Sequence, residues 1–205
     1  DRLEERAPHY NALVTLTRAR ALKQAKKAEH DIALSKYRGP LHGIPWGAKD
    51  LLATSGGIPT SWGAKPFKEQ AFQYDATVVK KLDQAGAVLS AKLAMIELAG
   101  GMGYRQPNAS LTGPCKSPWD KNTWAGGSSS GSGSAVGTGL VSFAIGSETW
   151  GSILSPANNC GVSGLRPTFG RVSRYGAMAL SWSLDKIGPL CLSADDCGIV
   201  LNEIA

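Results

Sequence analysis

The chain has 205 residues, of which 42% are hydrophobic, so it can bury a core suited to one domain or to part of a larger protein. No apolar run approaches the length of a membrane span, and the charged residues 1–6 lack the apolar centre of a secretory signal, which together predict a cytoplasmic protein. Much of the net charge of +6 comes from basic residues spaced like the solvated face of a helix, so we expect no direct binding to nucleic acid. These residues are Arg18, Arg20, Lys23, Lys26 and Lys27.

The first third of the sequence predicts a strand followed by a long helix. Residues 11–14, Asn-Ala-Leu-Val, predict a short strand. Residues 17–33 have helical spacing and predict an amphipathic helix with Leu22, Ala25 and Ala28 turned inward.

The rest of the chain continues this alternation. Asp75 is expected to cap a helix that ends at Gly86, and residues 87–91 then predict a buried strand. Further elements are a helix from about Ser134, a strand over 141–145, a loop over 146–155 and an amphipathic helix over 194–205. The last helix shows no stop signal, so we expect the protein to continue beyond Ala205. Alternating helices and strands favour an α/β layered fold.

The four cysteines are predicted to be reduced thiols. Cys115, Cys160, Cys191 and Cys197 contain no CxxC pair and have no histidine nearby. This pattern favours neither a zinc site nor a disulfide framework, and we expect no bound metal.

The most unusual segment is a run of nine glycines and serines over residues 126–134. Such a composition is typical of a flexible linker. Here the run follows Trp124 and continues into the small apolar residues 135–140, a pattern suited to tight burial. We therefore predict a buried loop that leads into a helix, where glycines let the backbone approach a substrate and serines supply hydroxyls. Ser152 lies in a second loop, also flanked by apolar residues.

Several known serine chemistries do not fit these loops. Residues 127–131 match the GxSxG elbow, but that relay needs a histidine after the serine, and His9, His30 and His42 all lie upstream. No Gly-Lys-Ser/Thr follows the glycines, as a phosphate-binding loop requires. Lysine is the remaining base for serine. Residues 183–186 match SxxK, a short pattern that arises easily by chance and lacks its companion motifs here.

Lys49 is the stronger candidate for the base. It ends an apolar stretch that contains Ile44, Trp46 and Ala48. Burial there would disfavour the ammonium form and lower its pKa. An ordinary surface lysine before Asp50 is the alternative.

Four segments, in this order, strongly resemble the amidase signature family. They are GIPWGAKD (43–50), AGGSSSGSGSAV (125–136), GSETWGSILSPANNCGVSGLRPTFGRVSRYGAMAL (146–180) and SLDKIGPL (183–190). The resemblance covers most of the chain from about Gly39 onward. It implies the amidase signature fold, a mixed twisted β-sheet core flanked by helices on both sides. Residues 1–205 would form the N-terminal and signature portion of a single catalytic domain.

The resemblance also implies a serine hydrolase with a Ser-Ser-Lys triad and no cofactor. Matching motif to motif, Lys49 takes the position of the base and Ser128, preceded by a cis peptide bond, that of the bridging serine. Ser152 takes the position of the nucleophile that forms the acyl-enzyme. The separation of Ser128 and Ser152, 24 residues, agrees with the family pattern. Ser129 resembles a serine that supports the lysine through a hydrogen bond, and its alternative is a helix-capping hydroxyl.

The turn around the proposed nucleophile is a candidate oxyanion hole. The backbone N–H groups of Thr149, Trp150, Gly151 and Ser152 can meet a developing oxyanion. The family usually has Gly-Gly-Ser before the nucleophile and a basic residue two positions after it, whereas this chain has Trp150 and Leu154. We expect Trp150 to contact the substrate as a wall of its cavity, and packing into the core beneath the loop is the alternative.

The sequence therefore predicts an amidase that hydrolyses the C–N bond of a small amide, with aryl amides, esters and carbamates as candidate substrates, the last making it a urethanase. Two alternatives stay open, the glutaminase subunit of a tRNA-dependent amidotransferase and a degenerate amidase scaffold that only binds ligands. The nearest amidotransferase subunits usually carry Gly-Gly-Ser-Ile-Arg in this loop, which argues against them. A small molecule is the expected partner, and a homo-oligomer is compatible with these features.

Overall fold

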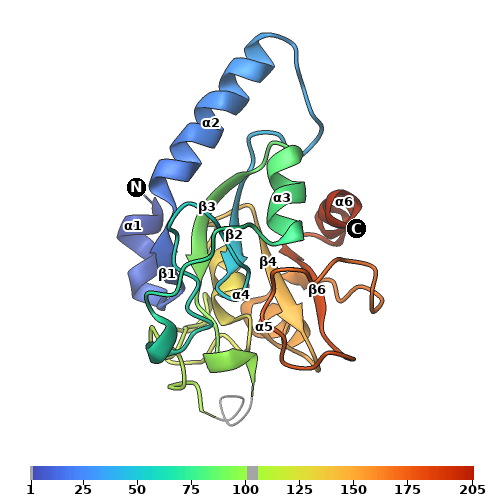
Figure 1. The fold of residues 1–205 in the computed structure, drawn as a ribbon. Coiled ribbons are helices and arrows are strands. Elements are labelled where there is room, and N and C mark those ends of the chain that lie inside the picture. The colour runs from blue at the N-terminus through green and yellow to red at the C-terminus, as the bar shows by residue number, and fades with distance from the viewer. Residues whose placement is uncertain (1, 101–105) are drawn as a thin grey trace.

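The computed structural model describes residues 2–100 and 106–205, which are built around a six-stranded mixed sheet (Figure 1). The strand order is β1-β3-β2-β4-β6-β5. The central strands β3, β2 and β4 are parallel, and β1, β6 and β5 pair with their neighbours antiparallel. The strands are β1 (Leu13–Leu16), β2 (Pro45–Lys49), β3 (Val88–Leu93), β4 (Phe143–Glu148), β5 (Ser163–Gly164) and β6 (Lys186–Cys191).

Helices cover both faces of this sheet. α4 and α5 pack on one face, α3 and α6 pack on the other, and α2 projects past the end of α3 (Figure 1). This arrangement confirms the predicted mixed sheet flanked on both sides. The α-helices are α1 (Arg2–Arg6), α2 (Arg18–Ala33), α3 (Thr77–Gln84), α4 (Ser130–Gly137), α5 (Leu154–Cys160) and α6 (Ala194–Ile204). The described residues also contain three short 3-10 helices, η1 (Ala7–Tyr10), η2 (Lys65–Phe67) and η3 (Glu97–Ala99).

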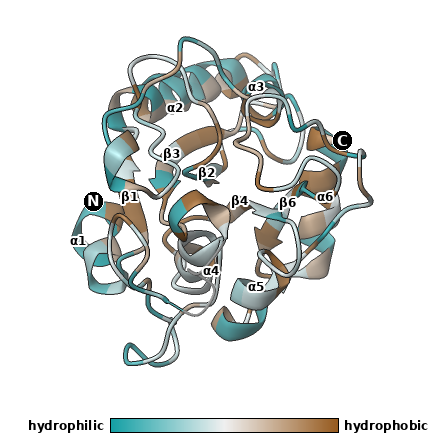
Figure 2. Ribbon diagram, turned by 60° about the horizontal axis from the view of Figure 1, so that its bottom comes forward, coloured by the Kyte–Doolittle hydropathy of each residue, from teal (hydrophilic) through white to brown (hydrophobic). Residues whose placement is uncertain are grey.

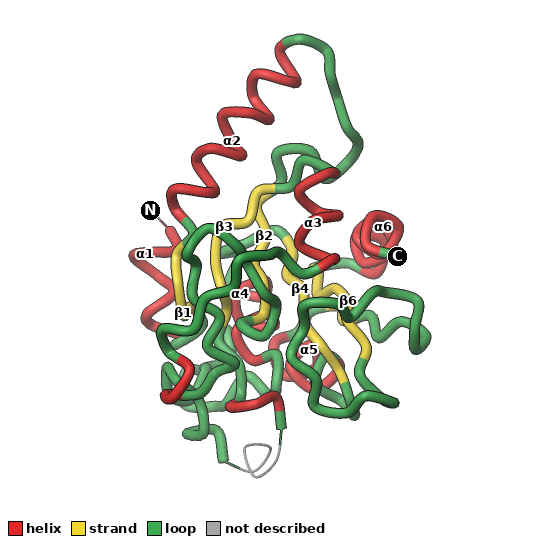
Figure 3. The backbone as a smooth tube through the Cα atoms, viewed as in Figure 1, coloured by secondary structure: helices red, strands yellow, loops and turns green. Residues whose placement is uncertain are grey.

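Each face of the sheet has its own apolar core, because successive side chains of a strand point to opposite faces. In β4, Phe143 and Ile145 belong to the core under α3 and α6, whereas Ala144 packs against α4. Loops gather at the lower edge of the sheet in Figure 3, and the ends of β2 and β4 lead into them.

A bulge at Ser90 in β3 determines on which face of the sheet Lys92 lies relative to Lys49 of β2. The register between β2 and β3 shifts there, so that Lys92 pairs with Ala48 and Leu93 pairs with Lys49. Partners in register share a face. Lys92 and Lys49 therefore lie on opposite faces of the sheet, although both are fully buried.

The Gly/Ser run forms a loop over 126–129 and the first part of α4 over 130–134, so the predicted buried loop that leads into a helix is confirmed. Residues 130–136 are all buried, and the helix begins at Ser130, four positions before the predicted start. A Cβ at Gly131 would lie 2.4 Å from the backbone nitrogen of Ala94 and 2.6 Å from the carbonyl oxygen of Ala12. Glycine is required because α4 packs directly on the backbone of its neighbours.

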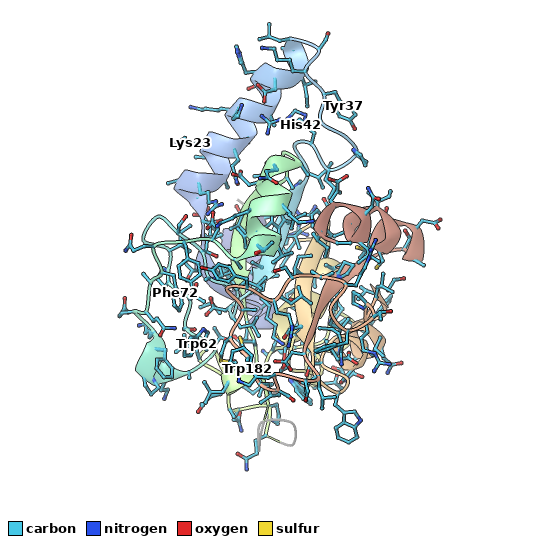
Figure 4. All side chains as sticks on the ribbon, turned by 45° about the vertical axis from the view of Figure 1, so that its right-hand side comes forward. Lys23, Tyr37, His42, Trp62, Phe72 and Trp182 are labelled. Atoms are coloured by element: carbon cyan, nitrogen blue, oxygen red, sulfur yellow. The ribbon has the colours of Figure 1, made fainter. Side chains whose placement is uncertain are left out.

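The predicted inner face of α2 is wrong for two residues. Leu22 is 53% exposed and Ala25 is also exposed, whereas Ala28 is buried as expected. The reason is that α2 extends past α3, so only its Gln24 and Ala28 side faces the protein. Hydrophilic residues dominate α2 in Figure 2, and Figure 4 shows Lys23 on this projecting part.

Asp75 does not cap α3, contrary to the prediction. The N-cap residue is Ala76 and makes no side-chain cap bond. Asp75 instead accepts two hydrogen bonds from Arg20, both at 2.9 Å, and one from the backbone N–H of Ser55 at 2.7 Å. The Arg20 side chain is accordingly only 18% exposed, so it is not part of a solvated helix face.

Other sequence predictions differ by a few residues. The strand predicted over 141–145 is β4, which begins at Phe143 and ends at Glu148. The loop predicted over 146–155 is shortened at both ends by β4 and α5. All four cysteines are buried free thiols. In the part of the chain that the structure describes, no helix is both long and apolar enough to cross a membrane.

Candidate active site

Lys49 ends β2 on the α4 side of the sheet and is fully buried. Its Nζ lies 2.7 Å from Ser128 Oγ, 2.9 Å from Ser129 Oγ and 2.9 Å from Ser147 Oγ. Burial lowers the pKa of Lys49 to about 7, although the carboxylates of Asp185 and Glu148 act in the opposite direction. The Lys49 Nζ atom is therefore surrounded by the hydroxyls of three serines.

The hydroxyl of Ser129 has its own acceptor. It donates to the Ser147 carbonyl oxygen at 3.2 Å and accepts from the Ser147 N–H at 3.3 Å. Its contact with Lys49 is then one in which the lysine donates, since the single hydroxyl proton is already used. Ser129 is the N-cap residue of α4 but makes no side-chain cap bond, so the capping alternative is wrong.

Ser128 lies at the bend between the loop and α4. The peptide bond that joins it to Gly127 is cis, as the family resemblance implied. Its carbonyl oxygen accepts a hydrogen bond from the N–H of Ile96 at 3.1 Å, and its side chain is fully buried beside Lys49.

Ser152 lies in the turn between β4 and α5 and is 3% exposed. Its carbonyl oxygen accepts a hydrogen bond from the N–H of Ser129 at 3.2 Å, so the two serine loops are in direct contact. Among residues 2–100 and 106–205, no hydrogen bond is made by the Ser152 hydroxyl. The structure thus brings Lys49, Ser128 and Ser129 together, with Ser152 adjoining them through its backbone.

In the turn 149–152, the carbonyl oxygens of Thr149, Gly151 and Ser152 accept hydrogen bonds. The carbonyl oxygen of Thr149 accepts from Lys186 Nζ at 3.0 Å, and that of Gly151 accepts from the N–H of Ser155 at 2.7 Å. The N–H groups of Gly151 and Ser152 donate to no acceptor in the described residues. Buried backbone donors usually have a partner, so free ones in a site are available to a ligand.

Sequence analysis missed two carboxylates that shape this turn. Glu148 Oε2 accepts from the N–H groups of Ile153 and Leu154, and Asp185 accepts from the Thr149 hydroxyl. The available sequence signal for Glu148 was an acidic residue inside the predicted loop 146–155, four positions before Ser152. Ser147 was also missed, since its contact with Lys49 depends on the pairing of distant strands.

Trp150 points away from the core, which excludes its packing beneath the loop. Its side chain is 83% exposed, and Leu154 is 42% exposed. A shallow hollow beside Ser147 is lined by Arg174, Met178 and Trp182 among others. Trp182 is itself 82% exposed and is labelled at this end of the molecule in Figure 4.

The other serine–base patterns are not assembled. Ser183 is exposed, and the amine of Lys186 is bonded to Thr149, so the SxxK pair does not form a site. His42 lies in the groove between α2 and α3 and accepts from the N–H of Arg38. Within the described residues, no group of three or more His, Cys, Asp or Glu is placed to hold a metal ion.

Comparison with known proteins places the chain in a family. The amidase family model matches residues 1–205. The chain is 43% identical to a Glutamyl-tRNA(Gln) amidotransferase subunit of Carboxydothermus hydrogenoformans and 45% identical to the putative amidase AmiD of Mycobacterium tuberculosis strain H37Rv. Each match covers 100% of this chain but only 41% and 42% of the relative, so the chain spans about two-fifths of their length.

Solved structures agree with these relatives. The native peptide amidase of Stenotrophomonas maltophilia superposes with a TM-score of 0.89 at 37% identity, over 99% of this chain and 42% of that protein. An amidase family protein of Bacillus anthracis superposes with a TM-score of 0.92 at 33% identity, over 99% and 41%. The chain belongs to the amidase signature family.

Proposed function

We propose that this chain carries the catalytic residues of a serine amidase that hydrolyses the C–N bond of a small amide. Residues 1–205 would be the N-terminal and signature portion of one catalytic domain. The observation that carries the proposal is the buried Lys49 amine, 2.7 Å from the Ser128 hydroxyl. A buried amine in contact with a hydroxyl can act as a general base.

In this proposal the proton of Ser152 passes to Ser128 as the Ser128 proton passes to Lys49. Ser152 Oγ bonds to the amide carbonyl carbon, and the tetrahedral intermediate collapses with cleavage of the C–N bond. The leaving amine takes the proton back along the same path. Water then repeats the sequence on the acyl-enzyme and releases the acid. The Ser152 hydroxyl must turn toward Ser128 for this transfer, and the backbone hydrogen bond between Ser129 and Ser152 keeps the two loops in contact.

The oxyanion would be bound by the free N–H groups of Gly151 and Ser152. Each good donor of this kind is worth about 3 kcal/mol of transition-state stabilisation. Trp150, next to these donors, would offer a flat apolar surface to an aryl amide, ester or carbamate. This exposed indole is what favours an aromatic substrate over a small aliphatic one.

A second candidate is the glutaminase subunit of a tRNA-dependent amidotransferase. It is favoured by the 43% identity to the Carboxydothermus amidotransferase subunit over the whole of this chain. It is opposed by Trp150 and Leu154, which depart from the usual loop. These same two residues are the argument for a third candidate, a scaffold that binds ligands without catalysis.

Labelling with a serine-reactive fluorophosphonate separates the catalytic proposals from the scaffold. We expect labelling of the intact protein at Ser152, and none in Ser152→Ala. Absence of labelling in the unmutated protein contradicts catalysis. Product release from a panel of aryl amides, carbamates and glutamine then distinguishes the amidase from the glutaminase, because only the latter prefers glutamine.

A further inference from the structure

Glu148 is a fully buried carboxylate at the end of β4, directly before the turn 149–152. Its Oε2 accepts hydrogen bonds from the N–H of Ile153 at 2.8 Å and of Leu154 at 2.9 Å. Its Oε1 forms an ion pair with Arg166 Nη1 at 3.0 Å. One side chain therefore joins the residue before the turn to the two residues after it.

We propose that Glu148 is a positioning residue that holds the turn 149–152 in the conformation in which the N–H groups of Gly151 and Ser152 are free, and that Arg166 balances the charge it introduces. The inference rests on the proposed function. Because Glu148 engages the N–H groups of Ile153 and Leu154, the turn folds around the carboxylate, and the preceding N–H groups of Gly151 and Ser152 stay free. The N–H groups of Ile153 and Leu154 therefore bind the Glu148 carboxylate, whereas those of Gly151 and Ser152 remain available to an oxyanion.

The same turn is fixed at two further points. Lys186, the partner of Glu148 across β4 and β6, donates to the Thr149 carbonyl oxygen at 3.0 Å, and Asp185 accepts from the Thr149 hydroxyl. These contacts fix the start of the turn only. Glu148 is the side chain that ties its end, next to Ser152.

The charge of Glu148 needs a counterion for a chemical reason. A negative charge near the site favours the ammonium form of Lys49 and opposes a developing oxyanion. The carboxylates that raise the pKa of Lys49 are Asp185 and Glu148. Asp185 is also bonded to the N–H groups of Leu180 and Ser181. Arg166 is the cation in contact with Glu148, and Lys186 uses its ammonium on a carbonyl oxygen instead.

We call the two hydrogen bonds from the Ile153 and Leu154 N–H groups to Glu148 Oε2 the clamp. The clamp and the negative charge of Glu148 can be tested separately. Because a single oxygen of Glu148 accepts both N–H groups, a glutamine can supply that oxygen and turn its NH₂ toward residue 166. The double variant Glu148→Gln/Arg166→Gln then keeps the clamp without either charge. Arg166→Gln alone leaves the carboxylate without its counterion, and Glu148→Ala removes the clamp.

The rate of fluorophosphonate labelling of Ser152 in the intact protein, measured against pH, is the readout. We expect Arg166→Gln to move the rising limb to higher pH by about half a unit or more, with the plateau retained. In the double variant the rising limb should lie at its original pH or at a lower pH, because the negative charge at residue 148 is gone. Glu148→Ala should lower the plateau about 100-fold or more, as loss of oxyanion donors does.

The matched control is Arg18→Gln, which breaks an exposed Arg–Glu pair between α1 and α2 and should change neither limb nor plateau. An unmoved limb in Arg166→Gln overturns the inference, as does an unchanged plateau in a folded Glu148→Ala. If Glu148→Ala does not fold, Arg166→Gln and the double variant Glu148→Gln/Arg166→Gln still test the inference. An unmutated protein that is never labelled overturns the proposed function itself, a result distinct from a labelled protein with an unmoved limb.

Discussion

Ser129 accepts a hydrogen bond from Lys49 at 2.9 Å while its own proton is held by the carbonyl oxygen of Ser147 at 3.2 Å. Its hydroxyl is therefore unable to relay a proton to the lysine without first losing the bond to Ser147. Ser128, whose hydroxyl contacts Lys49 at 2.7 Å, has no such competing acceptor in the described residues. Two adjacent serines of the same Gly/Ser run thus differ in what their hydroxyls can do.

This difference predicts unequal effects of alanine at the two positions. Ser128→Ala should reduce the labelling rate of Ser152 by about 1,000-fold or more, because the proton path is broken. Ser129→Ala should cost only about 10- to 100-fold, because it removes one hydrogen bond that orients the amine. Labelling rates at a fixed alkaline pH measure both. Equal losses would show that Ser129 does more than orient Lys49.

The lowered pKa of Lys49 predicts how activity depends on pH. The amine is the active form, and burial brings its pKa to about 7 from an ordinary value of 10.5. Activity should therefore rise with pH through neutrality and level off above it, since protonation of the base is lost in that range. The rising limb should be absent from the residual activity of Lys49→Ala. A rate that falls steadily above neutrality would mean that a protonated group is required instead.

Trp150 is expected to affect substrate choice more than stability. Its side chain is 83% exposed, so Trp150→Gly removes little buried surface and should leave the unfolding temperature nearly unchanged. The ratio of kcat/KM between aryl and small aliphatic amides should fall by about 10-fold, as an aromatic contact is lost. Trp119→Gly is a comparison variant with a similarly exposed indole. An unchanged substrate ranking in Trp150→Gly would exclude the proposed contact.

The pair of Asp50 and Lys92 predicts a large loss of stability on the other face of the sheet. Their side chains are buried and lie 3.2 Å apart, and Lys92 also donates to Thr60 Oγ1 at 2.6 Å. Burial lowers the pKa of Lys92 to about 8 and raises that of Asp50, against the effect of the pairing. Lys92→Met should reduce the free energy of unfolding by about 3–5 kcal/mol, because it leaves a buried carboxylate unpaired.

The double variant Asp50→Asn/Lys92→Met supplies the control for this pair. It contains no buried charge and should be less destabilised than Lys92→Met alone. Urea unfolding of the intact protein measures both values. A double variant that is less stable than the single one would show that the hydrogen bonds of Asp50 with Ser61 outweigh its uncompensated charge.

The parts of the site that could be predicted from the sequence are those carried by contiguous motifs. Lys49 ends a buried apolar stretch, and the Gly/Ser run passes into small apolar residues, so both could be placed without knowledge of the sheet. Ser147 could not be found in this way, because its contact with Lys49 depends on the register of β4 against β2. The face occupied by Lys92 depends in turn on the bulge at Ser90, for which the local sequence has no signal.

The error in α2 has a similar origin. Helical spacing indicated an apolar side containing Leu22, but whether that side is covered depends on the length of α3, an element more than 40 residues later in the chain. Periodicity identifies a face and does not say what packs against it.

The backbone contacts of α4 bear on how this gene tolerates mutation. An added methyl group at Gly131 would meet the backbone of Ala94, and one at Gly133 would lie 2.8 Å from the carbonyl oxygen of Pro156. A composition that protein engineers choose for flexible linkers here forms a buried helix with little room for added atoms. Codon randomisation or peptide-tag insertion between residues 130 and 136 should therefore yield few folded clones. A segment of low sequence complexity would then be one that tolerates few substitutions.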